Sequence, residues 1–251
     1  DCPICDQAGE CELQDLYFAH DHLPSRHAFR KRHKVKARLL GPEVVYDAER
    51  CINCTRCIRV CDEVARQPQL CQVQRGERAF IDVFPGMQLD HPYSLCTVDV
   101  CPVGALTSRD FRFKCRVWFM RGTPSVCMEC SRGCSVRVDT FDNAVQRVVP
   151  RENPRVNGHW ACDEGRLAFH RFETGRLTSP QWQGADVPYA TAVREVANAL
   201  TGSAQATALL LSPALTNEDA SAIIEFLRPR TSRLVVAIGG RSDGITDAIL
   251  R

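Results

Sequence analysis

Residues 51–61 read Cys-Ile-Asn-Cys-Thr-Arg-Cys-Ile-Arg-Val-Cys, and this stretch constrains the fold of the chain more than any other. Three cysteines at intervals of three, with a fourth four residues later, match the C-x2-C-x2-C-x3-C run of bacterial ferredoxins. A tight loop can turn the first three thiolates toward one corner of a four-iron cube, one for each iron. The fourth iron then needs a ligand from distant sequence. The spacing therefore predicts a [4Fe-4S] site at Cys51, Cys54 and Cys57.

The distant ligand is predicted to be Cys101, which precedes a proline. In ferredoxins with two clusters, the last cysteine of each run binds the cluster of the other run. Counting back from Cys101 with the same spacing lands on three residues that are not cysteines: Thr97, Ser94 and His91. We therefore expect one cluster in a degenerate ferredoxin-like fold, in which Cys61 has lost its own cluster. Four zinc-binding thiolates are the alternative. Cys51, Cys54, Cys57 and Cys101 are called the ferredoxin set.

Three cysteines near the start of the chain form a second motif, the N-terminal set of Cys2, Cys5 and Cys11. Three thiolates at loop spacing indicate metal binding but cannot complete a four-iron cluster. His20 and His22 are candidates for the fourth ligand, and so is a residue upstream of Asp1.

A third motif, the C-terminal set, reads Cys127-x2-Cys130-x3-Cys134 and is completed by Cys162 after a spacer of 27 residues. Within the spacer, residues 136–139 and 145–149 alternate like strands around a turn at 142–143. A small β-layer should therefore carry another [4Fe-4S] cluster, with structural zinc as the alternative.

Cysteine usage and charge narrow the class of protein. All 15 cysteines of the 251-residue chain lie at or before Cys162, and no signal peptide or membrane-length apolar run accompanies them. This pattern favours a reducing compartment with metal-bound cysteines rather than disulfides. The net charge of +2 singles out no partner. Because the chain starts at Asp1 and stops at Arg251, we expect a fragment truncated at both ends. The length suits two or three compact units.

Coarse secondary structure can be assigned between the motifs. Residues 12–40 look helical, and their basic run 30–36 suggests a solvated face or a dock for an acidic partner subunit, with nucleic-acid binding as the alternative. Residues 43–50 should form a strand, a short helix should follow Cys61, and residues 71–75 and 78–84 should pair as a hairpin. Three further cysteines without ligand spacing are expected to be small buried hydrophobes: Cys71, Cys96 and Cys115.

The chain after residue 179 changes character, because cysteine disappears. Helices are predicted at 190–200 and 217–227, and apolar strands at 208–211 and 234–238, which suggests an open α/β unit. Gly239-Gly240 is no nucleotide-binding signal by itself, because no G-x-G-x-x-G follows a strand.

The motifs in combination resemble one family over nearly the whole chain, namely the large iron–sulfur subunit of bacterial NADH:quinone oxidoreductase, respiratory complex I. Four stretches carry the resemblance: Cys-Pro-Ile-Cys-Asp-Gln-Ala-Gly-Glu-Cys-Glu-Leu-Gln at 2–14, Arg-Cys-Ile-x-Cys-Thr-Arg-Cys at 50–57, Cys-Pro-Val-Gly-Ala-Leu-Thr at 101–107, and Trp-x-Cys-Asp-x-Gly-Arg at 160–166. The resemblance implies three [4Fe-4S] clusters, the first with a histidine ligand upstream of Asp1. It also implies a [2Fe-2S] domain before Asp1.

The function implied by the resemblance is electron conduction. In the family, a flavin on a partner subunit oxidises NADH, and clusters pass single electrons toward quinone. The expected partners are the FMN- and NADH-binding subunit and the quinone-side hydrophilic subunits, with no nucleic acid and no membrane span. The expected place is the cytoplasmic face of the bacterial inner membrane, peripherally bound, or the matrix side in mitochondria. We expect no catalytic residue in this chain, because no group looks like a general base or nucleophile.

Two relatives offer an alternative function: NAD-linked formate dehydrogenase, a molybdenum enzyme, and the diaphorase subunits of soluble hydrogenases. Molybdenum enzymes resemble this chain around the fourth cysteine, where they read Cys-x-Lys-Gly-Arg, but Glu164 stands here at the lysine position. An ionised carboxylate would repel an anionic cluster and pterin, and Asp163 should make the patch more negative still. We therefore expect no molybdenum, unless Glu164 turns outward and another residue takes its place.

The expected fold class is α+β, in four parts. Residues 1–42 form a [4Fe-4S] segment with one histidine and three cysteines and a basic helical stretch. Residues 43–119 form the degenerate ferredoxin-like [4Fe-4S] domain. Residues 120–178 form a small β-rich [4Fe-4S] domain, and residues 179–251 begin an open α/β molybdopterin-oxidoreductase-like domain.

Overall fold

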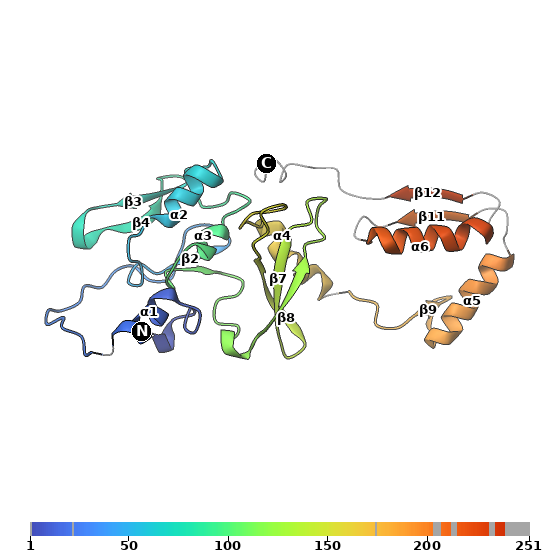
Figure 1. Cartoon of the computed structure of the whole chain (residues 1–251), viewed down its shortest axis with the longest axis horizontal. Coiled ribbons are helices and arrows are strands. Elements are labelled where there is room, and N and C mark those ends of the chain that lie inside the picture. The colour runs from blue at the N-terminus through green and yellow to red at the C-terminus, as the bar shows by residue number, and fades with distance from the viewer. Residues whose placement is uncertain are drawn as a thin grey trace. The chain divides into compact units, whose positions relative to one another are not determined.

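The computed structural model describes residues 2–21, 23–173, 175–202, 207–211, 215–230 and 234–238. The described residues form two compact units, one up to Phe169 and the other from His170 onward. Both mix short helices and strands, so the predicted α+β class is confirmed (Figure 1). No helix among the described residues is long and apolar enough to cross a membrane.

The strands of the first unit form three small sheets. Their bounds are β1 Arg38–Leu39, β2 Val44–Tyr46, β3 Leu70–Val73, β4 Phe80–Val83, β5 Leu106–Ser108, β6 Arg121–Val126, β7 Ser135–Phe141 and β8 Ala144–Pro150. The sheets are antiparallel and have the orders β1-β2-β5, β3-β4 and β6-β7-β8. The predicted strand at 43–50, the hairpin and the C-terminal β-layer are therefore present, and β6 is an addition that the sequence pattern did not indicate.

The helices of the first unit are short. They are η1 Cys2–Ile4, α1 Glu12–His20, α2 Arg56–Arg59, the π-helical turn η2 Val60–Val64, η3 Gly76–Arg78, α3 Cys96–Asp99, η4 Val117–Phe119, α4 Asp163–Leu167 and the start of η5 Ala168–Phe172. The helix expected after Cys61 is thus η2, which continues α2.

The ferredoxin-like part is built around one apolar core. Leu40, Val44, Tyr46 and Leu106 come from the first sheet and its flanks, and they are at most 2% exposed. The β3-β4 hairpin adds Leu70 and Ile81, and the Tyr46 hydroxyl accepts a hydrogen bond from the Ile81 N–H at 3.0 Å. This core fixes the backbone from which the cysteines of the ferredoxin set project.

The prediction of a basic helix over 12–40 is only partly right, because helix α1 stops at His20 and the basic run is extended. Consecutive positive charges repel one another on a helix surface and leave no apolar face to bury. The run is held by acidic residues instead. Glu49 accepts from the Lys34 N–H at 3.2 Å and pairs with Lys36, and Glu77 pairs with Arg32.

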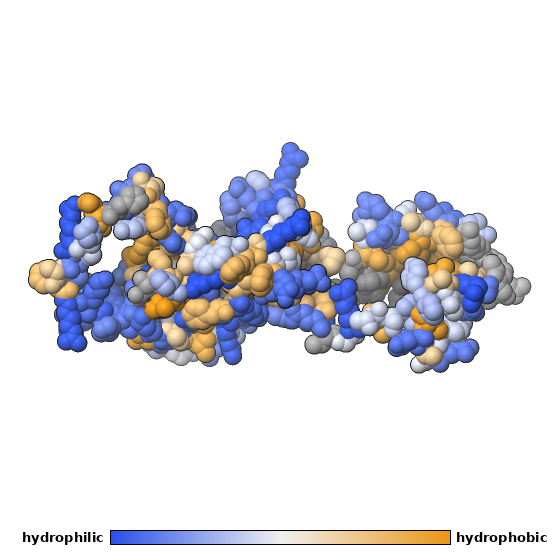
Figure 2. Space-filling view, turned by 90° about the horizontal axis from the view of Figure 1, so that it is seen from below, coloured by the Kyte–Doolittle hydropathy of each residue, from blue (hydrophilic) through white to orange (hydrophobic). Residues whose placement is uncertain are grey.

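The surface of this part carries many exposed apolar side chains. On and beyond α1 they include Leu13, Leu16, Phe18, Leu23 and Phe29. Figure 2 shows apolar residues interspersed with hydrophilic ones on one face of the protein. Of the cysteines expected to be buried hydrophobes, Cys96 is buried, whereas Cys71 and Cys115 are half-buried, because each lies near the edge of the unit's core.

The second unit is described by itself. It contains the hairpin β9 Gln181–Trp182 with β10 Ala185–Asp186, then α5 Tyr189–Gly202, β11 Thr207–Leu211, α6 Asn217–Leu227, η6 Arg228–Arg230 and β12 Leu234–Ile238. Strands β11 and β12 pair in parallel, and α6 lies between them in sequence, as the predicted α/β order requires. Gly239-Gly240 lies outside the described residues.

Candidate metal centres

The ferredoxin set converges on one pocket, which all four of its cysteines line. Three of them come from the loop that leads into α2, and Cys101 follows α3. The loop turns sharply because Asn53 and Thr55 adopt the left-handed conformation, with φ of 53° and 62°. For a β-branched residue such as Thr55 this is a strained conformation, which persists where the surrounding structure fixes it. The prediction that Cys101 is the distant partner agrees with this arrangement.

The environment of these thiols favours a metal centre over free cysteine. Burial, and then the neighbouring Cys101 and Cys51, raise the pKa of the Cys57 thiol to about 12. Burial also raises the pKa of Cys101. A lone thiol here would stay protonated, and several thiolates would repel one another, so positively charged metal is needed to hold them ionised. The residues present therefore fit a cluster.

The C-terminal set is brought together by a loop and a helix start. Cys127, Cys130 and Cys134 lie between β6 and β7, and Cys162 caps α4. Burial, and then Cys127 and Cys162, raise the pKa of Cys134 to about 11. The loop closes through a hydrogen bond from the Cys127 N–H to the Cys134 carbonyl at 2.8 Å.

Gly165 shows how closely this set approaches the backbone. A Cβ atom at this position would lie 2.8 Å from the Cys127 sulfur and 3.4 Å from the Cys162 sulfur. The Gly165 N–H points at the Cys162 sulfur at 3.4 Å and opposes the rise in pKa that burial imposes on that thiol. A residue without a side chain is therefore needed where α4 meets the sulfurs.

The N-terminal set lies against the segment that follows Cys101. The Cys11 thiol donates to the Pro102 carbonyl at 3.6 Å, and a Cβ atom on Gly104 would collide with the Cys5 sulfur. Cys5 is buried, whereas Cys2 is exposed. Two cysteines of this set therefore contact the same turn that carries a ligand of the ferredoxin set.

The structure does not bring His20 to the N-terminal set. It ends α1, roughly 12 Å along the axis from the residue after Cys11 at 1.5 Å per residue, and it is exposed. His22 lies outside the described residues. Among the residues that the structure describes, no group of three or more His, Cys, Asp or Glu side chains is arranged to hold a single metal ion.

The degenerate run, residues 91–101, is packed solid where a second cluster would lie in a complete ferredoxin. His91, Ser94 and Thr97 are at most 2% exposed, as is Cys61, whose sulfur lies 3.5 Å from His91 Nε2. His91 Nδ1 in turn accepts a hydrogen bond from the Tyr93 N–H at 3.2 Å. Cys61 and Cys96 do not rebuild a site together, because the Cys96 thiol instead donates to the Ala161 carbonyl at 3.3 Å.

Asp163 differs from the sequence-based expectation. It does not add to a negative patch around the cysteines, because its carboxylate accepts hydrogen bonds from the Ser94 N–H and Oγ and from the Leu95 N–H. Glu164, the next residue, is exposed. The outward orientation that the sequence left open for Glu164 is therefore the one observed.

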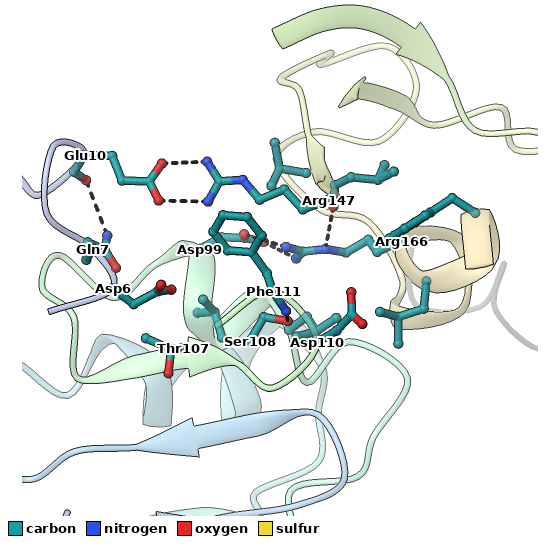
Figure 3. Close-up of a pocket in the computed structure, with 16 residues that line it drawn as sticks. Asp6, Gln7, Glu10, Asp99, Thr107, Ser108, Asp110, Phe111, Arg147 and Arg166 are labelled. Atoms are coloured by element: carbon teal, nitrogen blue, oxygen red, sulfur yellow. Dashed lines mark hydrogen bonds and ion pairs between the residues drawn. The ribbon is translucent and has the colours of Figure 1, made fainter. Parts of the chain in front are cut away.

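Two arginines that sequence reasoning gave no site role join the three cysteine-bearing segments (Figure 3). Arg147 on β8 forms a bidentate pair with Glu10 at 2.8 and 2.6 Å and also contacts Asp139 at 2.8 Å. Arg166 forms a bidentate pair with Asp99. Glu10 directly precedes Cys11, and Asp99 lies two residues before Cys101. No local pattern reveals these pairs, because their members are 137 and 67 residues apart.

Family models match the three regions that hold the three cysteine sets. The model of the NADH-ubiquinone oxidoreductase-G iron–sulfur binding region matches residues 1–26. The ferredoxin-like domain of NADH-quinone oxidoreductase subunit 3 matches residues 41–107. The NADH-ubiquinone oxidoreductase NDSU1/NuoG-like 4Fe-4S domain matches residues 120–170.

Curated proteins show the same likeness. The chain is 36% identical over 234 residues to NADH-quinone oxidoreductase-G of Streptomyces coelicolor, covering 91% of this chain and 28% of that protein. It is 37% identical over 180 residues to the protein of the same name from Rickettsia bellii, covering 72% and 26%. It is 40% identical over 186 residues to the mitochondrial NADH dehydrogenase [ubiquinone] iron-sulfur protein 1 of Solanum tuberosum, covering 74% and 25%. The chain thus spans about a quarter of the length of these relatives.

A crystal structure of NAD+-reducing [NiFe]-hydrogenase in the H2-reduced state is similar at a TM-score of 0.36 and 27% identity, over 46% of this chain and 50% of that one. At that score the likeness defines no shared arrangement.

Proposed function

We infer that this chain, which belongs to the NADH-quinone oxidoreductase-G family, relays single electrons through iron–sulfur clusters. One observation carries the inference: the four cysteines of the ferredoxin set line one pocket inside a region that matches a ferredoxin-like domain. The electrons would come from NADH through a flavin-bearing partner and leave toward quinone. The other subunits of the complex are the proposed partners, and a peripheral position at the membrane is the proposed location.

We propose three [4Fe-4S] clusters, one for each cysteine set. The ligands would be Cys2, Cys5 and Cys11 with a histidine upstream of Asp1, then the ferredoxin set, then the C-terminal set. The proposed domain bounds remain 1–42, 43–119, 120–178 and 179–251, with a [2Fe-2S] domain before Asp1.

The chain's own residues supply what such a relay needs. A bound [4Fe-4S] cluster accepts and donates one electron at a time. The core around Tyr46, Ile81 and Val103 lines the ferredoxin pocket and excludes water from it, which limits solvent reorganisation when charge changes. Gly104 and Gly165 let backbone approach the cysteine sulfurs where a side chain would collide. No described residue needs to exchange a proton or form a bond with substrate for this role.

Iron and acid-labile sulfide analysis with EPR of the reduced full-length protein tests the proposal. Each of Cys11→Ser, Cys101→Ser and Cys134→Ser should remove or convert a different [4Fe-4S] signal. Because a zinc site is colourless, colourless protein with stoichiometric zinc and no iron would refute the relay.

A further inference from the structure

Asp163 connects the C-terminal set to the ferredoxin-like domain. It follows Cys162 directly, and its N–H donates to the Pro92 carbonyl at 2.8 Å. Its Oδ2 accepts from the Ser94 N–H at 2.9 Å and from the Ser94 hydroxyl at 2.6 Å, and its Oδ1 accepts from the Leu95 N–H at 3.0 Å. Three donors on one carboxylate hold the side chain in a single orientation.

These donors belong to the degenerate run. Ser94 occupies the position of the second cysteine in a complete C-x2-C-x2-C-x3-C run that ends at Cys101. Successive backbone N–H groups in such a turn form a concave binding site for an anion, and in cluster proteins hydrogen bonds to the sulfurs serve this purpose. Here the N–H groups of Ser94 and Leu95 face a carboxylate, so Asp163 supplies the negative acceptor that this turn can bind.

The surroundings show that the whole turn 161–166 is seated on residues 92–99. The Cys96 thiol donates to the Ala161 carbonyl, and the buried Arg166 guanidinium pairs with Asp99 at 2.6 and 3.0 Å. Cys96 and Tyr93 form one apolar cluster with Cys162. The position of Cys162 is therefore set by contacts with the ferredoxin-like domain as well as by its own β-layer.

We propose that Asp163 is a positioning residue for the C-terminal set, whose carboxylate occupies the anion-binding turn of the degenerate run and so fixes Cys162 against the ferredoxin-like domain. The loss of the second ferredoxin cluster thereby created the attachment point for the neighbouring cysteine set. This inference rests on the proposed function, because it takes the C-terminal set to hold a cluster.

The test compares three variants of the full-length protein with its clusters assembled. Asp163→Asn keeps the size of the side chain but places an amide N–H against the Ser94 or Leu95 donors. Glu164→Gln is the matched control, since it removes the same charge one residue away from an exposed position. Ser94→Ala removes one of the three hydrogen bonds from the opposite side of the contact, at a residue distant in sequence from every cysteine of the C-terminal set.

We measure the EPR signal assigned to the C-terminal set by its loss in Cys134→Ser, and the rate at which a chelator removes the iron belonging to that signal. Asp163→Asn should speed this loss about 10- to 100-fold, the usual effect of removing a contact that orients a ligand. Ser94→Ala should have a smaller effect in the same direction, and Glu164→Gln should have none. The double variant should be no worse than Asp163→Asn, because both changes break the same contact.

The outcomes separate the two proposals. Wild-type protein without any signal dependent on Cys134 would overturn the proposed function. A wild-type signal that Asp163→Asn leaves unchanged in shape and chelator resistance would overturn only the role of Asp163. Equal effects of Asp163→Asn and Glu164→Gln would also overturn it, because charge alone would then be the cause. Should Asp163→Asn fail to fold, Ser94→Ala decides: altered chelator resistance supports the contact, and wild-type resistance refutes it.

Discussion

Arg166 and Asp99 form a bidentate ion pair, with N–O distances of 2.6 and 3.0 Å, between residues that lie four positions after Cys162 and two before Cys101. The Arg166 side chain is 6% exposed, and its Nε also donates to the Val148 carbonyl at 3.2 Å. This pair ties the helix that starts at one proposed ligand to the turn that precedes another. It therefore fixes the separation of two proposed cluster sites.

Removing one partner of this pair should destabilise the first unit. Asp99→Asn leaves the buried Arg166 charge uncompensated, and we expect a loss of about 3 kcal/mol in the free energy of unfolding, the low end for a broken buried pair. Urea unfolding of the full-length protein measures it. Glu63→Gln, which breaks the exposed pair with Arg59, is the control and should leave the urea midpoint unchanged. Equal midpoints for both variants would contradict the prediction.

Cys101→Ser should remove or convert the EPR signal of the ferredoxin set, whereas Cys61→Ser should leave that signal intact. Cys101 lines the pocket with Cys51, Cys54 and Cys57, whereas Cys61 contacts His91 instead. Equal loss of the signal in both variants would mean that the ligands have been paired wrongly.

Gly165→Ala separates helix stability from site geometry. Alanine favours helix over glycine by about 1 kcal/mol, so α4 itself should become no weaker. Its Cβ atom would nevertheless lie 2.8 Å from the Cys127 sulfur, so the signal of the C-terminal set should be lost or converted. EPR and circular dichroism together measure the two effects. Glu164→Ala in the same helix is the control, and an unchanged signal in Gly165→Ala would rule out the close approach.

Glu49 should hold the basic segment in place over a wide pH range. The pairing with Lys36, opposed by desolvation and aided by His33 and the Lys34 N–H, lowers the pKa of Glu49 to about 2. Because the folded pKa lies below the unfolded value of 4.5, this stabilisation is complete above about pH 4.5 and is lost as the pH falls through about 2.

Glu49→Gln should therefore increase tryptic cleavage at Arg30 and Lys31, and its stability difference from wild type should be the same at pH 7 and pH 5. Glu43→Gln is the control, because it removes a carboxylate of the same size just before strand β2, away from the basic run. A difference that shrinks between pH 7 and pH 5 would contradict the pKa shift.

The full-length protein should contain no stoichiometric molybdenum or tungsten and should not reduce dyes with formate. Glu164 stands where molybdenum enzymes that resemble this chain have lysine, and a carboxylate cannot donate hydrogen bonds while ionised. Metal analysis with a formate-dependent dye assay checks this. Molybdenum together with formate oxidation would favour formate dehydrogenase instead.

Local spacing alone was enough to predict the loop ligands and most strands. Cys51, Cys54 and Cys57 lie within one turn of the backbone, and the register of alternating apolar residues in β7 and β8 follows from the two-residue period of a strand. The α1 prediction failed beyond His20 because helical spacing of Leu13, Leu16 and Tyr17 says nothing about the charged residues that follow.

The sequence by itself determined which cysteines group together and that one ferredoxin site is degenerate, because these facts depend on short spacings that the covalent chain enforces. Only the tertiary structure decided how the groups are joined. Arg147 reaches Glu10 across 137 residues, and Asp163 reaches Ser94 across 69. Such pairs leave no periodic trace, since each forms only after apolar cores have brought distant segments together and excluded the water that would otherwise solvate the charges.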